Sequence, residues 1–198
     1  MEGQPCSPCA SPLHPQPCSP AVTPAPPVLQ GAMWRVLPLK EFRNTPGVQF
    51  HLVPIDKIGT IHSIDRVFHA HSAQSPGPVG DVQRPWYYHQ NQDDNLLVFH
   101  GERTTELYNS LTHSIETFLV TPNKIMKDGQ VLYDGPAVLC WPAGTFHRVS
   151  SGPEGSMSEN FAVHKSGWHV ETNFSIYDLN LATGQSRVIR VGREDQLM

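Results

Sequence analysis

The feature of this sequence that most constrains its fold is the recurrence of short runs rich in β-branched and aromatic residues, separated by Gly, Pro, Asn and Asp. Such runs are typical of β-strands, and the residues between them are typical of turns. No segment shows a sustained apolar period of about 3.6 residues, which an amphipathic helix would require. Many short strands at intervals of about 8 to 12 residues predict an all-β sandwich or barrel. The predicted strands are 48–53, 66–70, 85–90, 96–100, 103–108, 114–120, 137–141, 145–149, 160–164, 169–177 and 186–191, with one short helical turn within 121–127.

The composition changes near residue 33. Residues 1–32 hold nine of the nineteen prolines, a single charged residue, Glu2, and no aromatic side chain. So little apolar surface cannot offset about 1 to 2 kcal/mol of backbone ordering entropy per residue. We therefore expect a disordered, Pro-rich tail at 1–32 and one folded domain at 33–198, which is long enough for a single hydrophobic core.

The cysteines do not indicate a disulfide framework. Cys6, Cys9, His14 and Cys18 approximate the spacing of a zinc knuckle, but the last gap is one residue short and prolines stiffen the segment. Plain thiols are the favoured interpretation. The remaining cysteine, Cys140, lies in an apolar run, so the chain fits a reducing compartment.

Charge and hydropathy exclude several classes of protein. The formal net charge is −4 and no Lys/Arg cluster is present, so we expect no nucleic-acid partner. No run of about 18 apolar residues that could span a bilayer occurs, and the first residues lack a secretion signal. The sequence also lacks the glycine-rich phosphate-binding loop and the Gly-x-Ser-x-Gly elbow of serine hydrolases. A soluble, cytoplasmic protein without membrane contacts is predicted.

Two spaced patterns carry the chemistry. The first is Gly80…Tyr87-Tyr88-His89…Asp94…Gly101, in which four residues separate His89 from Asp94 and six separate Asp94 from Gly101. The second is Gly135…Pro142-x-Gly144-x2-His147, followed by Ser151.

Together these patterns resemble the two signature motifs of the cupin superfamily, Gly-x5-His-x-His-x3/4-Glu-x6-Gly and Gly-x5-Pro-x-Gly-x2-His-x3-Asn. The resemblance covers about residues 80–151. Asp94 stands at the Glu position, Tyr87 at the first His position and Ser151 at the Asn position, while Gly80 and Gly135 each lie one residue too far upstream. The resemblance implies a single cupin-type antiparallel β-barrel, or jelly roll.

The resemblance further implies that His89, Asp94 and His147 bind a divalent metal ion, with Tyr87 in place of one imidazole. Two His and one carboxylate are a known ligand set for non-haem Fe(II), and Zn, Mn or Ni are alternatives. Asp93 or Gln92 would supply the oxygen ligand if the loop before Leu96 shifted by one residue.

Strand parity indicates which side chains point inward. In an extended run Tyr87 and His89 share one face, so both are expected to face the interior, where Tyr87 could bind a substrate oxygen or act as a general acid. Thr145, His147 and Val149 likewise share a face. The pair His69 and His71 has no carboxylate at a suitable distance, and the segment that follows it from Ser72 has the composition of a loop. Residues 152–159 are read as a flexible connection, most simply a hairpin loop.

Three functions remain open at this stage. The favoured prediction is oxygenase chemistry on a small organic molecule at the two-His, one-carboxylate site. The second is isomerisation or epimerisation, as in sugar-nucleotide epimerases that share the cupin barrel, with His89 as the base. The third is a non-catalytic cupin that holds a small ligand. A homodimer is expected, because such barrels often pair through edge strands.

Overall fold

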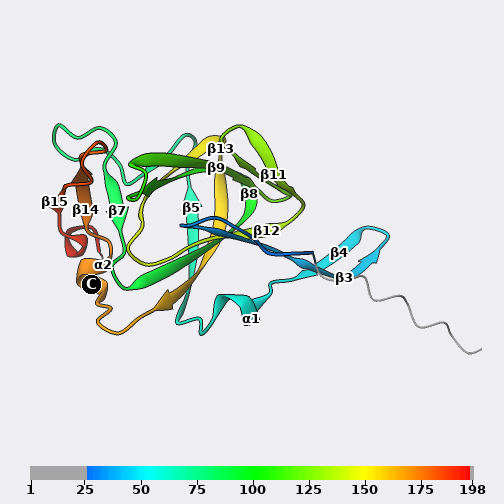
Figure 1. The fold of residues 1–198 in the computed structure, drawn as a ribbon. Helices are drawn as coiled ribbons and strands as arrows, with labels where there is room; N and C mark the ends of the chain where they lie inside the picture. The colour runs from blue at the N-terminus through cyan, green and yellow to red at the C-terminus, as the bar shows by residue number, and fades with distance from the viewer. Residues whose placement is uncertain (1–25, 197–198) are drawn as a thin grey trace, which may run out of the picture.

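The computed structural model describes residues 26–196 and shows a fold made almost entirely of β-strands (Figure 1). Cys6, Cys9, His14 and Cys18 lie outside the described residues. No helix in the described part of the chain has the length and apolar character that crossing a membrane requires. The elements are β1 (Leu29–Gln30), β2 (Arg35–Pro38), β3 (Lys40–Thr45), β4 (Val48–Leu52), α1 (Ile55–Ile58), β5 (Ser63–His69), β6 (Gln74–Ser75), β7 (Trp86–Tyr88), β8 (Gln92–Asn109), β9 (Ser114–Thr121), β10 (Lys124–Lys127), β11 (Gln130–Asp134), β12 (Ala137–Trp141), β13 (Phe146–His164), α2 (Val170–Asn173), β14 (Ile176–Leu179), β15 (Ser186–Arg190) and the 3₁₀ turn η1 (Gly192–Asp195).

Thirteen of these strands form one hydrogen-bonded sheet, and β3 and β4 form a second sheet of two strands. The main path of the large sheet runs β1-β2-β12-β8-β13-β7-β14-β15, with β5, β6 and the β9–β11 meander as branches. The predicted all-β class is confirmed. The strand order is open, with β1 and β15 at its two ends, so the hydrogen bonds of the described strands do not close a barrel.

The architecture is organised by β8 and β13, which pair antiparallel over nearly their whole length. This two-stranded ribbon bends where Gly101 meets Gly155. Gly101 has a φ of 66°, and a Cβ atom there would lie 2.0 Å from the carbonyl oxygen of Gly155, so no other residue fits without a shift of the backbone. The bend brings Asp94, near the start of β8, close to His147, near the start of β13.

The bend corrects two predictions from the sequence. The strands predicted at 96–100 and 103–108 are halves of one strand, β8. The connection predicted at 152–159 lies inside β13, where the register with β8 shifts between Ser151 and Ser156. Gly, Pro and Ser in this segment are typical of a loop, but here they form the irregularity that lets a long strand bend.

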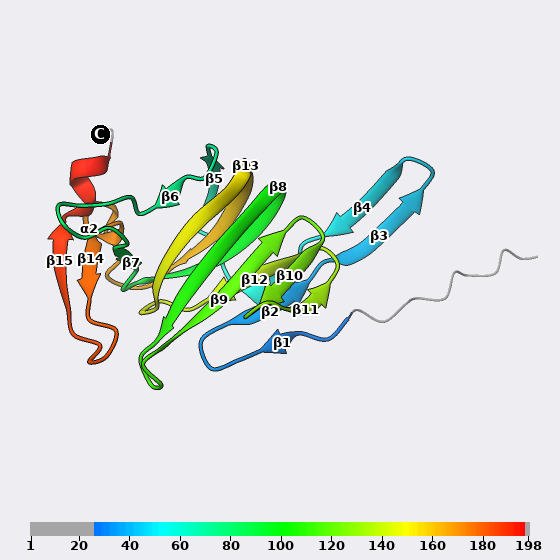
Figure 2. The same ribbon diagram turned by 90° about the horizontal axis from the view of Figure 1, so that it is seen from above.

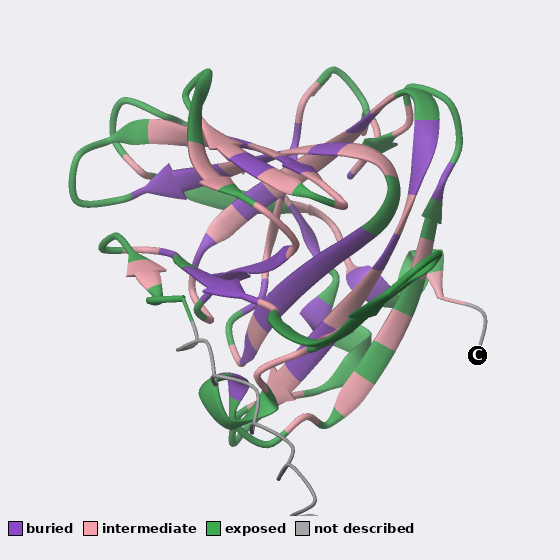
Figure 3. Cartoon of the chain, turned by 90° about the vertical axis from the view of Figure 1, so that its right-hand side faces the viewer, coloured by how far each residue is buried: buried purple, intermediate pink, exposed green. Residues whose placement is uncertain are grey.

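The hydrophobic core lies between the halves of the large sheet, and buried segments gather in the interior of the molecule (Figure 3). Phe118 and Ile125 are fully buried, and the ring of Trp34 packs edge-on against Phe118 at 5.3 Å. We call this cluster the apolar core. Its members are Trp34, Val36, Leu96, Val98, Leu107, Phe118, Val120, Ile125, Ala137, Leu139 and Trp141.

The predicted helical turn within 121–127 is wrong, because Lys124–Lys127 is the middle strand of the β9–β10–β11 meander. Asp128 and Gly129 follow it with φ of 49° and 81°. Positive φ at both central residues is the geometry of a tight hairpin, and Asp-Gly is a strong signal for it. Ile125 is fully buried, so packing against the core also favours the strand.

The strand predicted at 169–177 is wrong in its first part. Val170–Asn173 is a single helical turn, and a strand begins only at Ile176. Asn173 is buried and hydrogen-bonded through both its side chain and its carbonyl oxygen. These tertiary contacts hold the turn in place.

The β3–β4 hairpin projects from the rest of the molecule (Figure 2). Most of its residues are exposed, including Phe42 and Phe50, whose rings lie 5.3 Å apart. Of its two strands only β4 was predicted, because Lys, Glu, Arg and Asn in 40–45 are depleted in strands.

Candidate metal centre

Three potential metal ligands meet in the interior: His89, Asp94 and His147. Their ligand atoms all lie within 4.8 Å of one another. Asp94 Oδ2 is 3.8 Å from His89 Nε2 and 4.0 Å from His147 Nε2. All three residues are buried, with only 3% to 5% of their surface exposed. His89 follows β7, Asp94 lies in β8 and His147 lies in β13, so the structure brings together the three residues that the sequence pattern named.

Both imidazoles are oriented by backbone carbonyl groups. His89 Nδ1 contacts the carbonyl oxygen of Asn173, and His147 Nδ1 lies 3.1 Å from that of Thr145. A carbonyl oxygen only accepts hydrogen bonds, so each Nδ1 carries the proton when the ring is neutral and each Nε2 presents a lone pair. This is the arrangement that outer hydrogen bonds give to metal-binding histidines.

The two oxygens of Asp94 have different surroundings. Oδ1 accepts hydrogen bonds from Gln92 Nε2 at 2.8 Å and Asn160 Nδ2 at 2.9 Å. Oδ2 is buried and has no hydrogen-bond partner among the described residues. A buried carboxylate oxygen without a partner is costly, and here it faces two nitrogen lone pairs. A divalent cation between these three atoms would satisfy all of them, so the residues present fit a metal ion.

The protonation state of His147 suits this role. Burial, followed by the neighbouring His89, lowers the pKa of His147 to about 4, although Asp94 and the Thr145 carbonyl oppose the shift. The ring is therefore neutral near pH 7, and neutral imidazole is the form that binds metals.

Asp93 and Gln92, the alternative ligands, have other roles. Asp93 Oδ1 accepts the backbone N–H of Ala143 at 2.7 Å and lies 2.6 Å from Lys165 Nζ. Gln92 holds Asp94 through its amide nitrogen, and its Oε1 accepts a hydrogen bond from Asn173 Nδ2 at 2.9 Å. Asp93 orders the turn before β13, and Gln92 connects the α2 segment to Asp94.

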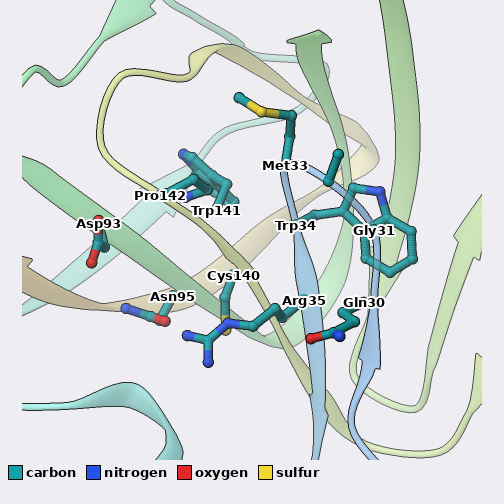
Figure 4. Close-up of a pocket in the computed structure, with 11 residues that line it drawn as sticks. Gln30, Gly31, Met33, Trp34, Arg35, Asp93, Asn95, Cys140, Trp141 and Pro142 are labelled. Carbon is teal, nitrogen blue, oxygen red and sulfur yellow. The ribbon is translucent and has the colours of Figure 1, made fainter. Parts of the chain in front are cut away.

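A separate hollow of about 200 Å³ borders Asp93 on the side of β1 and β2 (Figure 4). Cys140 and Trp141 also line it. Burial raises the pKa of the Cys140 thiol to about 12, so the reactive thiolate is not populated near neutral pH. This hollow does not contain the cluster of His89, Asp94 and His147.

His89, Asp94 and His147 line a cavity of about 430 Å³, which is in the size range of small-molecule sites. We call it the polar cavity. Tyr87 lines it as strand parity predicted, with its ring 6.0 Å from that of His89 and 5.9 Å from that of His147. Burial raises the pKa of Tyr87, so its phenol keeps its proton near neutral pH. The cavity is lined by Asp65, Val67, His69, Ser75, Tyr87, His89, Gln92, Asp94, Leu96, Arg103, Trp141, His147, Val149, Asn160 and Phe174.

Sequence reasoning missed several residues of this cavity. His69 falls in the strand predicted at 66–70 but is not among the predicted site residues. It ends β5 and is buried, while His71 is exposed. Alternation along β5 could have found it, because Asp65, Val67 and His69 share one face. No local pattern marks Arg103 as a cavity residue.

The sequence matches no protein-family model, and no curated protein sequence matches it. The evidence for the site is therefore its geometry. A buried His-Asp-His group in an all-β fold is compatible with a cupin, and it can hold a metal ion.

Proposed function

We propose that this chain is a cupin-type, metal-dependent enzyme that carries out oxygenase chemistry on a small organic molecule. The observation that carries the proposal is the convergence of Asp94 Oδ2, His89 Nε2 and His147 Nε2 at the edge of the polar cavity. Three protein ligands leave coordination positions open, as metal-dependent enzymes require. Fe(II) is the first choice, with Zn, Mn and Ni as alternatives.

The second group of supporting observations concerns positioning. Asn173 and Thr145 fix the two imidazoles, while Gln92 and Asn160 fix the carboxylate. The ligand atoms are therefore held in place before a metal binds, which lowers the cost of ordering them. Bound there, a redox-active ion would supply the electron transfer that oxygenase chemistry needs.

Tyr87 supplies a proton donor beside the ligand set. Its ring lies near both imidazoles, and its phenol is neutral at physiological pH. Such a group can donate a hydrogen bond to a substrate oxygen and stabilise negative charge that develops there. Phe174 and Val149 add apolar walls that limit the access of water.

The first experiment measures metal content by elemental mass spectrometry. We expect near-stoichiometric iron, manganese, nickel or zinc in the wild type and a loss of that metal in His147→Ala and in Asp94→Asn. His100→Ala is the matched control, since His100 is exposed and outside the cluster. Circular dichroism establishes that each variant is folded. The metal-loaded wild type is then tested for substrate-dependent oxygen consumption.

A folded wild type that takes up no metal when Fe(II) or Zn(II) is offered would contradict the proposal. That outcome would favour a metal-free isomerase or a ligand-binding protein. A His89→Asn variant separates these two: an isomerase that uses His89 as its base loses turnover, whereas a binding protein has no turnover to lose. Bound metal without oxygen consumption would leave the metal site in place but contradict oxygenase chemistry.

A further inference from the structure

Arg103 is the feature of the polar cavity that the metal site does not use. It lies in β8 just beyond the bend at Gly101, is 3% exposed, and lines the cavity. Its Nε donates to Ser156 Oγ at 2.9 Å and its terminal nitrogen to the carbonyl oxygen of Val67 at 3.2 Å. A guanidinium has five N–H donors, so these neutral partners leave part of its capacity free.

No carboxylate of the described residues forms a salt bridge with Arg103, whose two hydrogen-bond acceptors are neutral. Arg148 of the same chain shows how an arginine away from solvent is usually paired with a carboxylate. Its guanidinium binds both oxygens of Glu106, at 2.8 and 3.1 Å, and stacks on the ring of Trp86 at 4.1 Å. Burial alone lowers the pKa of Arg103, to about 10, and the group is still charged at neutral pH. A buried cation without an anion is costly, so its charge calls for an external partner.

His69 is a second, independent group with an open hydrogen-bonding position. It is 8% exposed, lines the same cavity, and its Nδ1 has no hydrogen-bond partner among the described residues. Burial, with a smaller contribution from Arg103, lowers the pKa of His69 to about 4. The imidazole is therefore neutral near pH 7, and its N–H can donate without adding charge.

We propose that Arg103, assisted by His69, binds the carboxylate of an organic acid, and that this acid is the substrate class of the site. The inference rests on the proposed function for its reaction, while the binding it describes is tested separately. Arginine suits this role because its planar fork of donors matches a carboxylate. Asp65 also lines the cavity, but its oxygens accept hydrogen bonds from Ser63 and Asn160.

The bent ribbon of β8 and β13 places Arg103 and the three candidate metal ligands at different positions along one cavity. Ser151, the β13 partner of Arg103, is four residues from His147, which corresponds to roughly 13 Å along the strand. The carboxylate would be held toward the bend, and the rest of the molecule would extend toward Tyr87 and the cluster. An acid with a chain of several atoms fits this arrangement.

The test compares hexanoate with hexanamide, and benzoate with benzamide, as matched probes that differ in charge. Binding is followed by the fluorescence of tryptophan, since Trp141 lines the cavity, and by isothermal titration calorimetry. Each titration is run on metal-loaded protein and on chelator-stripped protein, so that a carboxylate bound directly to a metal is recognised. We expect both acids to bind at least about 10-fold more tightly than their amides in either form.

Arg103→Met removes the charge with little change in volume, and Arg66→Met on the exposed outer face of β5 is its matched control. Arg103→Met should abolish the preference for acids while keeping its metal, and Arg66→Met should keep both. Arg103→Lys, which retains the charge but not the fork of donors, should keep part of the preference for acids. It serves as the test if Arg103→Met folds poorly. His69→Phe should weaken acid binding by a smaller factor.

The two proposals fail in different ways. Equal binding of acids and amides by metal-loaded wild type would overturn the anion site and leave the metal site intact. An acid preference that survives Arg103→Met in stripped protein would also overturn it. An acid preference in a wild type that takes up no metal would support the anion site and contradict the proposed oxygenase.

Discussion

The apolar core and the polar cavity share β8 and β12, where Leu96 and Trp141 border both, but they are built in opposite ways. In the core, Phe118 and Ile125 are fully buried against other apolar side chains. In the cavity, Asp94 Oδ2 and His69 Nδ1 are buried without hydrogen-bond partners among the described residues, and the charged Arg103 forms no salt bridge with any carboxylate of that part of the chain. The core gains free energy from every contact, whereas the cavity holds groups that reduce the stability of the fold.

The difference separates residues that the fold needs from residues that binding needs. Groups that cost stability and converge on one cavity are candidates for function. The organised part of the cavity supports this view, because Gln92, Asn160 and Asn173 hold Asp94 and His89 in place while Asp94 Oδ2 has no hydrogen-bond partner among the described residues. Substitutions in the two regions should therefore affect different measurements.

The largest effect is expected in the apolar core. Phe118→Ala removes a fully buried ring and should lower the free energy of unfolding by about 3 to 5 kcal/mol. Urea denaturation of metal-stripped protein measures this change. The fraction that remains folded should still bind metal stoichiometrically. A Phe118→Ala protein with unchanged stability would contradict the division between the two regions.

The next effect concerns pH and the cavity. His69 has a pKa of about 4 in the folded protein and about 6.5 when unfolded, so the unfolded state binds more protons between these values. The contribution of His69 to the free energy of unfolding should be fully present above about pH 6.5. It should be lost as the pH drops toward 4, which lowers the free energy of unfolding by up to about 3 kcal/mol. Urea midpoints from pH 7.5 to 4 measure it. His69→Phe should remove this part of the pH dependence and leave the part due to His147, whose pKa is also lowered to about 4, and the exposed control His100→Phe should change neither.

A smaller effect is expected from the hydrogen bonds around Asp94. Gln92→Leu removes the amide that holds Oδ1 and should weaken metal affinity by about 10- to 100-fold. Gln90→Leu, at an exposed position of the same segment, is the control. Competition with a chelator of known affinity measures both. Equal affinities in the two variants would show that the amide does not position the ligand.

The smallest effect is expected in the β3–β4 hairpin. Phe50 is 46% exposed, so Phe50→Ser should change the free energy of unfolding by less than about 0.5 kcal/mol. A larger loss would mean that the hairpin is packed in solution.

Light scattering of the wild type at micromolar concentration tests the homodimer predicted from the sequence, and a strict monomer would contradict it.

Local patterns located much of the site. The resemblance of two motifs to those of the cupin superfamily implied that the side chains of His89, Asp94 and His147 would meet, and alternation along a strand predicted that Tyr87 would face the same interior. Only the second prediction depends on the two-residue period of a strand. The same alternation along β5 places His69 on the face of Asp65 and Val67, which line the cavity.

Other features could not be read locally. Residues 152–159 have the composition of a loop but lie in a strand, because pairing with β8 continues across the bend. Asn173 holds His89 from a position 84 residues away, and Arg103 reaches Val67 across the cavity. Contacts between such distant positions arise from the folding of the whole chain.

By itself, the sequence determined the all-β class and most strand positions, because side-chain alternation and turn propensity act over a few residues. The resemblance of its two motifs to those of cupins named His89, Asp94 and His147 as candidate ligands. The tertiary structure decided that Asp94 rather than Asp93 faces the histidines, that Gln92 and Asn173 support them, and that Arg103 is buried without a salt bridge to any described carboxylate. These outcomes depend on the bend at Gly101 and Gly155, which folds one ribbon back on itself. Burial and electrostatic pairing are set by what lies across that bend, and no local pattern encodes it.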